Sequence, residues 1–197
     1  MAEYEYGRIK VLAEKLVKAE VGPDIIAEIM RDGEKITKTA KPEKKAEWLL
    51  SAMRRMDDLL ENQVRQSVRE SCACCLGGKR LELSKAIAKN FTTLDERLEE
   101  ANRTSMVFGH GVTREGDAYV VRFDQDGRES YGCVCLPRAK EPASPTYCFC
   151  CGGHIKHHLQ IALGLKLQCH VRHTALTSGG TKPCVLEYRE APADVKK

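Results

Sequence analysis

Apolar residues recur at helical spacing through the first half of the chain. Within residues 4–19 they stand three or four positions apart, which predicts a helix with one buried face. Gly22 and Pro23 interrupt this pattern, and a proline suits the first turn of the second helix that we expect over residues 24–31. The pattern therefore predicts two short helices at the start of the chain.

The longest periodic run predicts a single helix over residues 46–68, which ends near a group of cysteines. Another helix is expected over residues 79–91. Thr93 then caps a helix that reaches Asn102, because Glu96 stands three residues after Thr93, as in a capping box.

The pattern changes after residue 104, where glycine, proline and β-branched residues become more frequent. It predicts, in order, a loop at 109–111, a strand at 118–123, a loop at 137–145, a helix at 153–163 and strands at 166–174 and 182–189. We therefore expect an α+β fold, in which an N-terminal helical half packs on an antiparallel sheet with one intervening helix. The expected regions are a helical region at 1–103, a cysteine-rich α/β ligand- or metal-binding region at 104–190, and a tail at 191–197.

Charge and hydropathy exclude several classes of partner. The formal net charge of +4 is spread along 197 residues without a concentrated basic patch, so we expect no nucleic-acid partner. No window approaches the ~18 apolar residues of a membrane span, so we expect no membrane partner. The first twenty residues are charged and lack the apolar run of a signal peptide, which favours a cytoplasmic protein. The oligomeric state stays open.

Most of the ten cysteines lie in clusters, which makes them candidates for chemistry. Cys-x-Cys-Cys followed by two glycines and a basic residue occurs twice, at 72–79 and, one residue tighter, at 148–154. A third group is Cys133-Val134-Cys135. In a reducing compartment such clusters favour metal binding or catalysis over structural disulfides. Neighbouring cysteines would also close only small, strained disulfide rings.

Zinc is the cofactor that these residue types favour, because thiolates and histidine nitrogens hold Zn²⁺ tetrahedrally. His154 and His158 stand four residues apart and share one face of the expected helix. Cys169 alternates with apolar residues in a strand and is read as a core residue instead. The candidate metal ligands are Cys72, Cys74, Cys75, Cys133, Cys135, Cys148, Cys150, Cys151, His154, His158 and Cys184. An iron–sulfur cluster is the alternative cofactor. In a third interpretation the cysteines bind no cofactor and are reduced thiols packed in the protein interior.

The two Cys-x-Cys-Cys elements share their context as well as their spacing. Each reads as cysteines, then glycines, then a helix, and the positive end of a helix lowers the pKa of a cysteine placed there. We therefore expect the two elements to come together in space and form one site.

A resemblance supports this reading of the second half. The segment YCFCCGGHIKHHLQIALG at 147–164 and the later ending Cys-Val-Leu-Glu-Tyr at 184–188 resemble an uncharacterised cysteine-rich bacterial family of unknown function. Over residues 104–190 the chain is also similar to the small-molecule-binding domain of the 4-vinyl reductase superfamily, and to the L-2-amino-thiazoline-4-carboxylic acid hydrolase-like family. The resemblance implies an α/β domain that holds a small hydrophobic or heterocyclic ligand, sometimes beside a metal-binding cysteine group. The positions that carry over are Cys133, Cys135, Cys148, Cys150, Cys151, His154 and Cys184.

The function expected from these observations is a metal-binding protein that binds or senses a small molecule. The alternatives are a metal- or thiolate-dependent hydrolase of a small molecule, and an iron–sulfur protein. No P-loop, G-x-S-x-G or H-E-x-x-H motif is present in the sequence.

Overall fold

The computed structural model of the chain describes residues 3–139 and 141–192. The helices are α1 (Gly7–Lys18), α2 (Pro23–Ile29), the short 3-10 helix η1 (Gly33–Lys35), α3 (Pro42–Leu59), α4 (Asn62–Ser71), α5 (Gly78–Asn90), α6 (Leu94–Arg103), α7 (Ser105–Phe108) and α8 (Pro145–Leu163). The strands are β1 (Gly111–Glu115), β2 (Ala118–Arg122), β3 (Leu167–His173) and β4 (Val185–Glu190). The expected α+β class, with helices in the N-terminal half and an antiparallel sheet, is confirmed.

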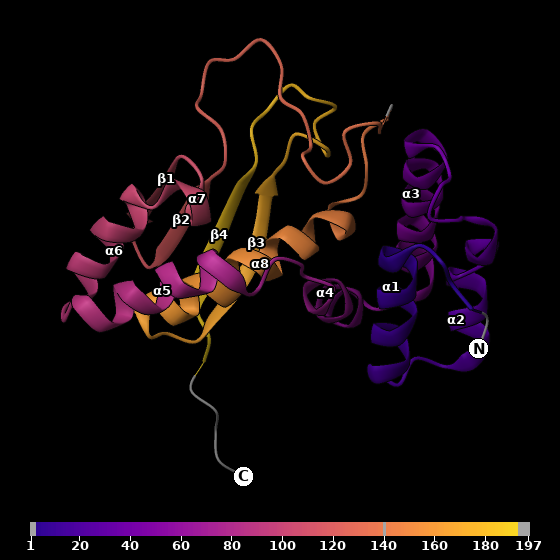
Figure 1. Cartoon of the computed structure of the whole chain (residues 1–197), viewed down its shortest axis with the longest axis horizontal. Coiled ribbons are helices and arrows are strands. Elements are labelled where there is room, and N and C mark those ends of the chain that lie inside the picture. Colours follow the sequence, from indigo (N-terminus) through magenta and orange to yellow (C-terminus); the bar gives the residue numbers. More distant parts are fainter. Residues whose placement is uncertain (1–2, 140, 193–197) are drawn as a thin grey trace.

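Helices α1 to α4 surround the first hydrophobic core (Figure 1). Leu12 of α1 and Met53 of α3 are fully buried in it, as their helical spacing predicts. The single helix expected over residues 46–68 is wrong, because α3 ends at Leu59 and Leu60 takes an extended conformation. The apolar pattern runs on through this break because the helices on both sides bury residues in the same core.

The sheet has the order β1-β2-β4-β3, and every neighbouring pair is antiparallel. Strand β1 was not expected as a strand; it pairs with β2, with Val112 opposite Val121. Only the first two of its five residues are buried, so it lacks a clear alternation. Helix α8 lies between β2 and β3 in sequence and packs on the sheet beside α5 and α6 (Figure 1).

Helix α8 begins at Pro145, not at residue 153 as expected, so the second Cys-x-Cys-Cys element lies inside the helix. Pro145 occupies the first turn, and Ser144 Oγ accepts a hydrogen bond of 3.1 Å from the Thr146 amide. Glycines lower helix propensity, which is why Gly152 and Gly153 predicted a later start.

Close packing explains why glycines stand in the middle of α8. A Cβ atom built on Gly152 would lie 2.6 Å from Cys169 Sγ in β3. A Cβ atom on Gly153 would run into the backbone of Glu70 in α4, with 2.8 Å to its Cα. The two glycines therefore let α8 contact a strand on one side and a helix on the other.

Helix α8 also joins the two halves of the molecule. Tyr147 and Cys148 in its first turns belong to the first core, whereas Ile155 and Leu159 belong to the second. The division into regions at 1–103 and 104–190 stays a prediction, and 193–197 of the expected tail lie outside the described residues. Across 3–139 and 141–192, no helix is long and apolar enough to cross a membrane.

Candidate functional site

The two Cys-x-Cys-Cys elements meet where α4, α5 and α8 come together. Cys150 Sγ of α8 donates to the Cys72 carbonyl at 3.6 Å. His154 Nδ1 lies 2.8 Å from the Cys74 carbonyl oxygen, and His158 Nε2 lies 3.1 Å from the Cys75 carbonyl oxygen. The expectation that the two elements come together is confirmed by these contacts.

The two elements differ in local structure. Cys72 follows the end of α4, and Cys74 and Cys75 lie in the exposed turn before α5, as expected for the first copy. The cysteines of the second copy lie in the first two turns of α8, so the expected order of cysteines, glycines and helix is wrong for that copy. An α-helix fixes the spacing of its side chains, so the second copy is the more rigid half of the cluster.

The third group, on the β2–α8 loop (residues 123–139 and 141–144), joins the same cluster. Cys135 Sγ and Cys151 Sγ are 3.7 Å apart, and both residues are half-buried. The thiol of Cys151 donates to Cys135, and this hydrogen bond, with the nearby charges of Arg8 and Arg69, lowers the pKa of Cys135 to about 6 despite its burial. The same hydrogen bond and burial raise the pKa of Cys151 well above its ordinary value. At neutral pH the pair is therefore a thiolate beside a thiol.

Two arginines and a tyrosine support this pair. Arg8 of α1 donates to the Cys135 carbonyl and to Tyr147 Oη, the latter at 3.0 Å. The Arg69 side chain of α4 is buried, donates to the Tyr147 carbonyl at 3.2 Å, and stacks 5.2 Å from the centre of that ring. Arg69 Nε has no hydrogen-bond partner among the described residues. We did not expect these three residues from the sequence; the only local signal is that Tyr147 adjoins a cysteine and Arg69 precedes one by three residues.

The exposed turn holds a second close pair of sulfurs. Cys75 Sγ lies 3.7 Å from Cys74 Sγ. Partial burial raises the pKa of Cys74 to about 11, helped by the nearby sulfurs of Cys150, Cys75 and Cys135. Burial also raises the pKa values of Cys72, Cys133 and Cys150. Burial, with a smaller contribution from neighbouring sulfurs, therefore opposes the ionisation of these thiols.

Two further candidate ligands, the buried Cys148 and the half-buried Cys184, have polar partners of their own. Cys148 Sγ is 3.1 Å from Thr174 Oγ1, and burial raises its pKa to about 12. Cys184 Sγ accepts from the Ala175 amide at 3.3 Å, and burial raises its pKa to about 11. The Cys133 sulfur makes a smaller contribution to both of these upward shifts in pKa.

The two candidate histidines contact backbone carbonyl groups rather than sulfur atoms. His154 and His158 each use a ring nitrogen on a carbonyl of the exposed turn, and His158 Nδ1 also lies 3.1 Å from Ser84 Oγ. Burial lowers the pKa of His154 to about 4 and also lowers that of His158. Both rings are therefore neutral at pH 7 and keep the turn attached to α8.

The sulfurs do not form a ready-made metal centre. Over the described ranges, no three cysteine, histidine or acidic side chains converge at distances suited to one metal ion. Cys169 lies apart from the cluster, buried in β3 in the second core.

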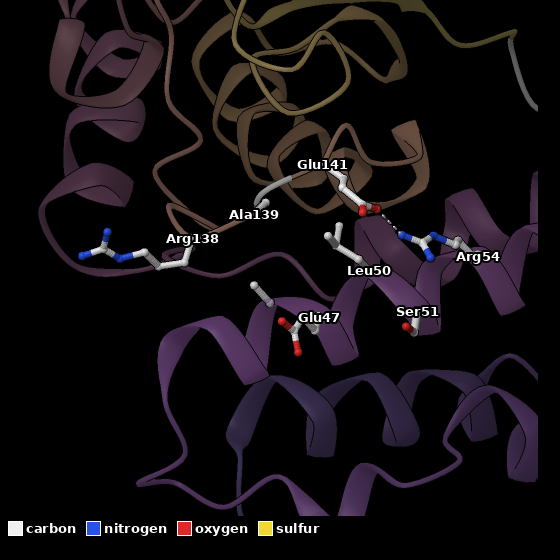
Figure 2. Close-up of a pocket in the computed structure, with 8 residues that line it drawn as sticks. Glu47, Leu50, Ser51, Arg54, Arg138, Ala139 and Glu141 are labelled. Carbon is white, nitrogen blue, oxygen red and sulfur yellow. Dashed lines mark hydrogen bonds and ion pairs between the residues drawn. The ribbon is translucent and has the colours of Figure 1, made fainter.

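A polar groove lies next to the loop that carries Cys135. It measures about 300 Å³ and is lined by α3 and by the segment after Cys135 (Figure 2). Arg54 and Glu141 form an ion pair of 3.1 Å across it, and Glu47 and Arg138 also line it. Half of its lining residues are charged, unlike the hydrophobic ligand site that the resemblance implies.

Comparison with known proteins places the chain in a family without assigning an activity. No curated protein and no solved structure matches the chain. The expected similarities to the 4-vinyl reductase and thiazoline hydrolase-like families stay predictions. The model of a family of unknown function, DUF6144, matches residues 5–187, and the chain therefore belongs to this family.

Proposed function

We propose that the protein binds a thiophilic metal ion, with zinc as the first candidate, through the cysteine cluster. The observation that carries the proposal is the spacing of the sulfurs in two pairs, Cys135–Cys151 and Cys74–Cys75, each 3.7 Å apart. Two thiolates on a tetrahedral zinc ion with Zn–S near 2.3 Å stand ~3.8 Å apart. Each pair therefore already has the spacing of two ligands of one ion.

The electrostatics of the cluster favour a cation. Burial and neighbouring sulfurs raise the pKa values of Cys74 and Cys150, so several thiols here resist ionisation in the free protein. A divalent ion removes that resistance, because a coordinated thiol loses its proton. Arg8 and Arg69 would offset the negative charge of a site with more than two thiolates.

The ligand set that we propose combines two pairs of cysteines: one pair that includes a residue of helix α8, and one pair in the exposed turn before α5. Cys135 and Cys151 anchor the ion, and Cys74 and Cys75, the second pair at ligand spacing, complete the shell. Cys148, Cys184 and both histidines are engaged by other polar groups. Among the described residues, no three of these ligands converge on one point. Binding therefore requires the exposed turn to move toward α8.

Two further parts of the proposal concern ligand and location. The groove between α3 and the β2–α8 loop is the proposed site for a small molecule. The groove carries both positive and negative side chains, which would suit a zwitterionic molecule. A cytoplasmic location is proposed because clustered, unpaired thiols persist in a reducing compartment.

A second candidate function, a thiolate-dependent hydrolase of a small molecule, is favoured by one observation. The pKa of Cys135 is lowered to about 6, so its nucleophilic form predominates at neutral pH. An iron–sulfur cluster is the alternative cofactor, because four cysteine thiolates can also hold one.

The test is elemental analysis of protein purified anaerobically without an affinity metal column. We expect about one zinc ion per chain, lost in Cys151→Ser and in Cys135→Ser. Cys169→Ala is the matched control, because Cys169 lies outside the cluster, and it should keep the zinc. Bound iron with a brown colour would instead support the iron–sulfur alternative. Protein that holds neither zinc nor iron, even after zinc is added, would contradict the proposal.

A further inference from the structure

Only one of the two close sulfur pairs is built to close as a disulfide. Cys74 and Cys75 are adjacent in sequence, so a bond between them would close a small, strained ring. Cys135 and Cys151 come from different segments, the β2–α8 loop and helix α8, and their sulfurs are 3.7 Å apart. A disulfide needs an S–S distance of about 2.05 Å, so the two sulfurs must approach by less than the width of one atom.

The surroundings assign different roles to the two sulfurs. Arg8 donates a hydrogen bond to the Cys135 carbonyl, so a guanidinium group lies beside this cysteine. Cys151 is fixed within α8 and faces that sulfur, whereas Cys135 lies outside regular helix and strand. The mobile partner is therefore Cys135, and the fixed partner is Cys151.

We propose that Cys135 and Cys151 are a reversible dithiol–disulfide pair that reduces hydroperoxides, an activity that uses two of the proposed metal ligands but does not depend on bound metal. Cys135 thiolate attacks one peroxide oxygen; an S–O bond forms, the O–O bond breaks, and the leaving hydroxide or alkoxide takes a proton. The product is a sulfenic acid on Cys135. Cys151 then attacks that sulfur; the S–S bond forms, the S–O bond breaks, and the hydroxide leaves as water with the proton of Cys151.

The step balances with one hydroperoxide reduced and two thiols oxidised. A small dithiol returns the pair to its reduced state by thiol–disulfide exchange and is itself oxidised to a disulfide. Arg8 acts here as a positioning residue, because it holds the Cys135 carbonyl and Tyr147 Oη together.

The experiment uses the full chain, reduced, freed of metal with a chelator and then freed of reductant. Hydrogen peroxide is added, remaining thiols are blocked, and peptides are mapped without reduction. We expect a predominant Cys135–Cys151 crosslink, with the loss of two hydrogen atoms from the chain, that dithiothreitol reverses. This mapping needs no variant, so it cannot fail through misfolding.

Variants then separate the two roles. Cys151→Ser should stop at a sulfenic acid on Cys135 that dimedone traps, and Cys135→Ser should lose the crosslink. Cys169→Ala should form the crosslink as the wild type does. Predominant crosslinks between other cysteines, or sulfinic acid on Cys135 of the wild type without a disulfide, would overturn the inference.

Zinc titration of the reduced protein separates this inference from the proposed function. A crosslink in protein that does not bind zinc would leave the inference standing and overturn the metal proposal. Zinc binding in protein that forms no crosslink would do the reverse.

Discussion

At the scale of single residues, the cluster differentiates chemically similar thiols by their immediate neighbours. Cys135 accepts a hydrogen bond from Cys151 and lies near two guanidinium groups, so its pKa falls to about 6. Cys148 contacts a threonine hydroxyl, and burial raises its pKa to about 12 although the Arg69 charge acts on it too. Position within the cluster therefore decides which sulfur is a nucleophile at neutral pH.

This difference predicts the pH dependence of alkylation. A thiol with a lowered pKa is ionised above that pKa, so iodoacetamide should modify Cys135 at a nearly constant rate above about pH 7 and more slowly below about pH 6. The measurement is mass spectrometry of the Cys135 peptide of metal-free protein after short exposures.

Arg8 supplies the matched variants for this profile. Arg8→Gln removes a positive charge and should move the midpoint upward, whereas Arg8→Lys keeps the charge and should move it less. A wild-type midpoint near the ordinary cysteine pKa of ~8.5 would contradict the assignment of the thiolate to Cys135.

At the scale of elements, α8 organises the site. It carries the second Cys-x-Cys-Cys element and both histidines, and it contacts α4 on one side and β3 on the other. The exposed turn before α5 is tied to it by the two histidine contacts to carbonyls. The cluster therefore depends on how closely α4 approaches α8.

A single methyl group should disturb that approach. In Gly153→Ala the new Cβ would meet the backbone of Glu70, which cannot rotate away as a side chain could. We expect a loss of about 1–3 kcal/mol in the free energy of unfolding, measured by urea denaturation. Gly7→Ala, at the start of α1 with open space around it, is the control and should change stability little. Equal stability of Gly153→Ala and wild type would mean that α4 does not pack on α8 as described.

The sequence predicts elements well where one face of a helix is buried in a core. Leu12 and Met53 show this, since their spacing alone places them inside. It fails where packing between elements overrides local propensity. Gly152 and Gly153 predict a helix that begins after them, but in the structure they lie inside α8 and let it pack closely on its neighbours. The meeting of the two cysteine elements followed from their repeated spacing. Arg8, which is 127 residues from Cys135 in sequence, could not be found this way, because only the tertiary fold brings it there.

At the scale of the whole molecule, the cluster lies between two hydrophobic cores. Cys72, Cys133 and Cys135 pack against the first core, while α8 continues into the second. A ligand that joins sulfurs from the turn before α5, the β2–α8 loop and α8 would therefore link segments of both halves. Such a ligand should stabilise the molecule as a unit.

Thermal unfolding tests this linkage. Zinc at a free concentration of 100 times its Kd should stabilise the reduced protein by about 2.7 kcal/mol, which corresponds to a rise in Tm of roughly 5–10 °C for a chain of this size. Magnesium, which prefers oxygen ligands, is the control and should leave Tm unchanged. A Tm that does not respond to zinc would show that zinc does not bind preferentially to the native protein, and it would contradict the proposed site.

The crossing of α4 and α8 also sets a limit on how members of this family can diverge. Position 153 faces backbone and position 152 faces a sulfur atom, so neither can accept a side chain without moving an element. Gly132, on the loop with open space around it, carries no such restriction. We expect substitutions among relatives to accumulate at positions like 132 and to be absent at 153 wherever this helix crossing is retained. A glycine pair inside a helix would then mark members of the family whose cysteines have changed.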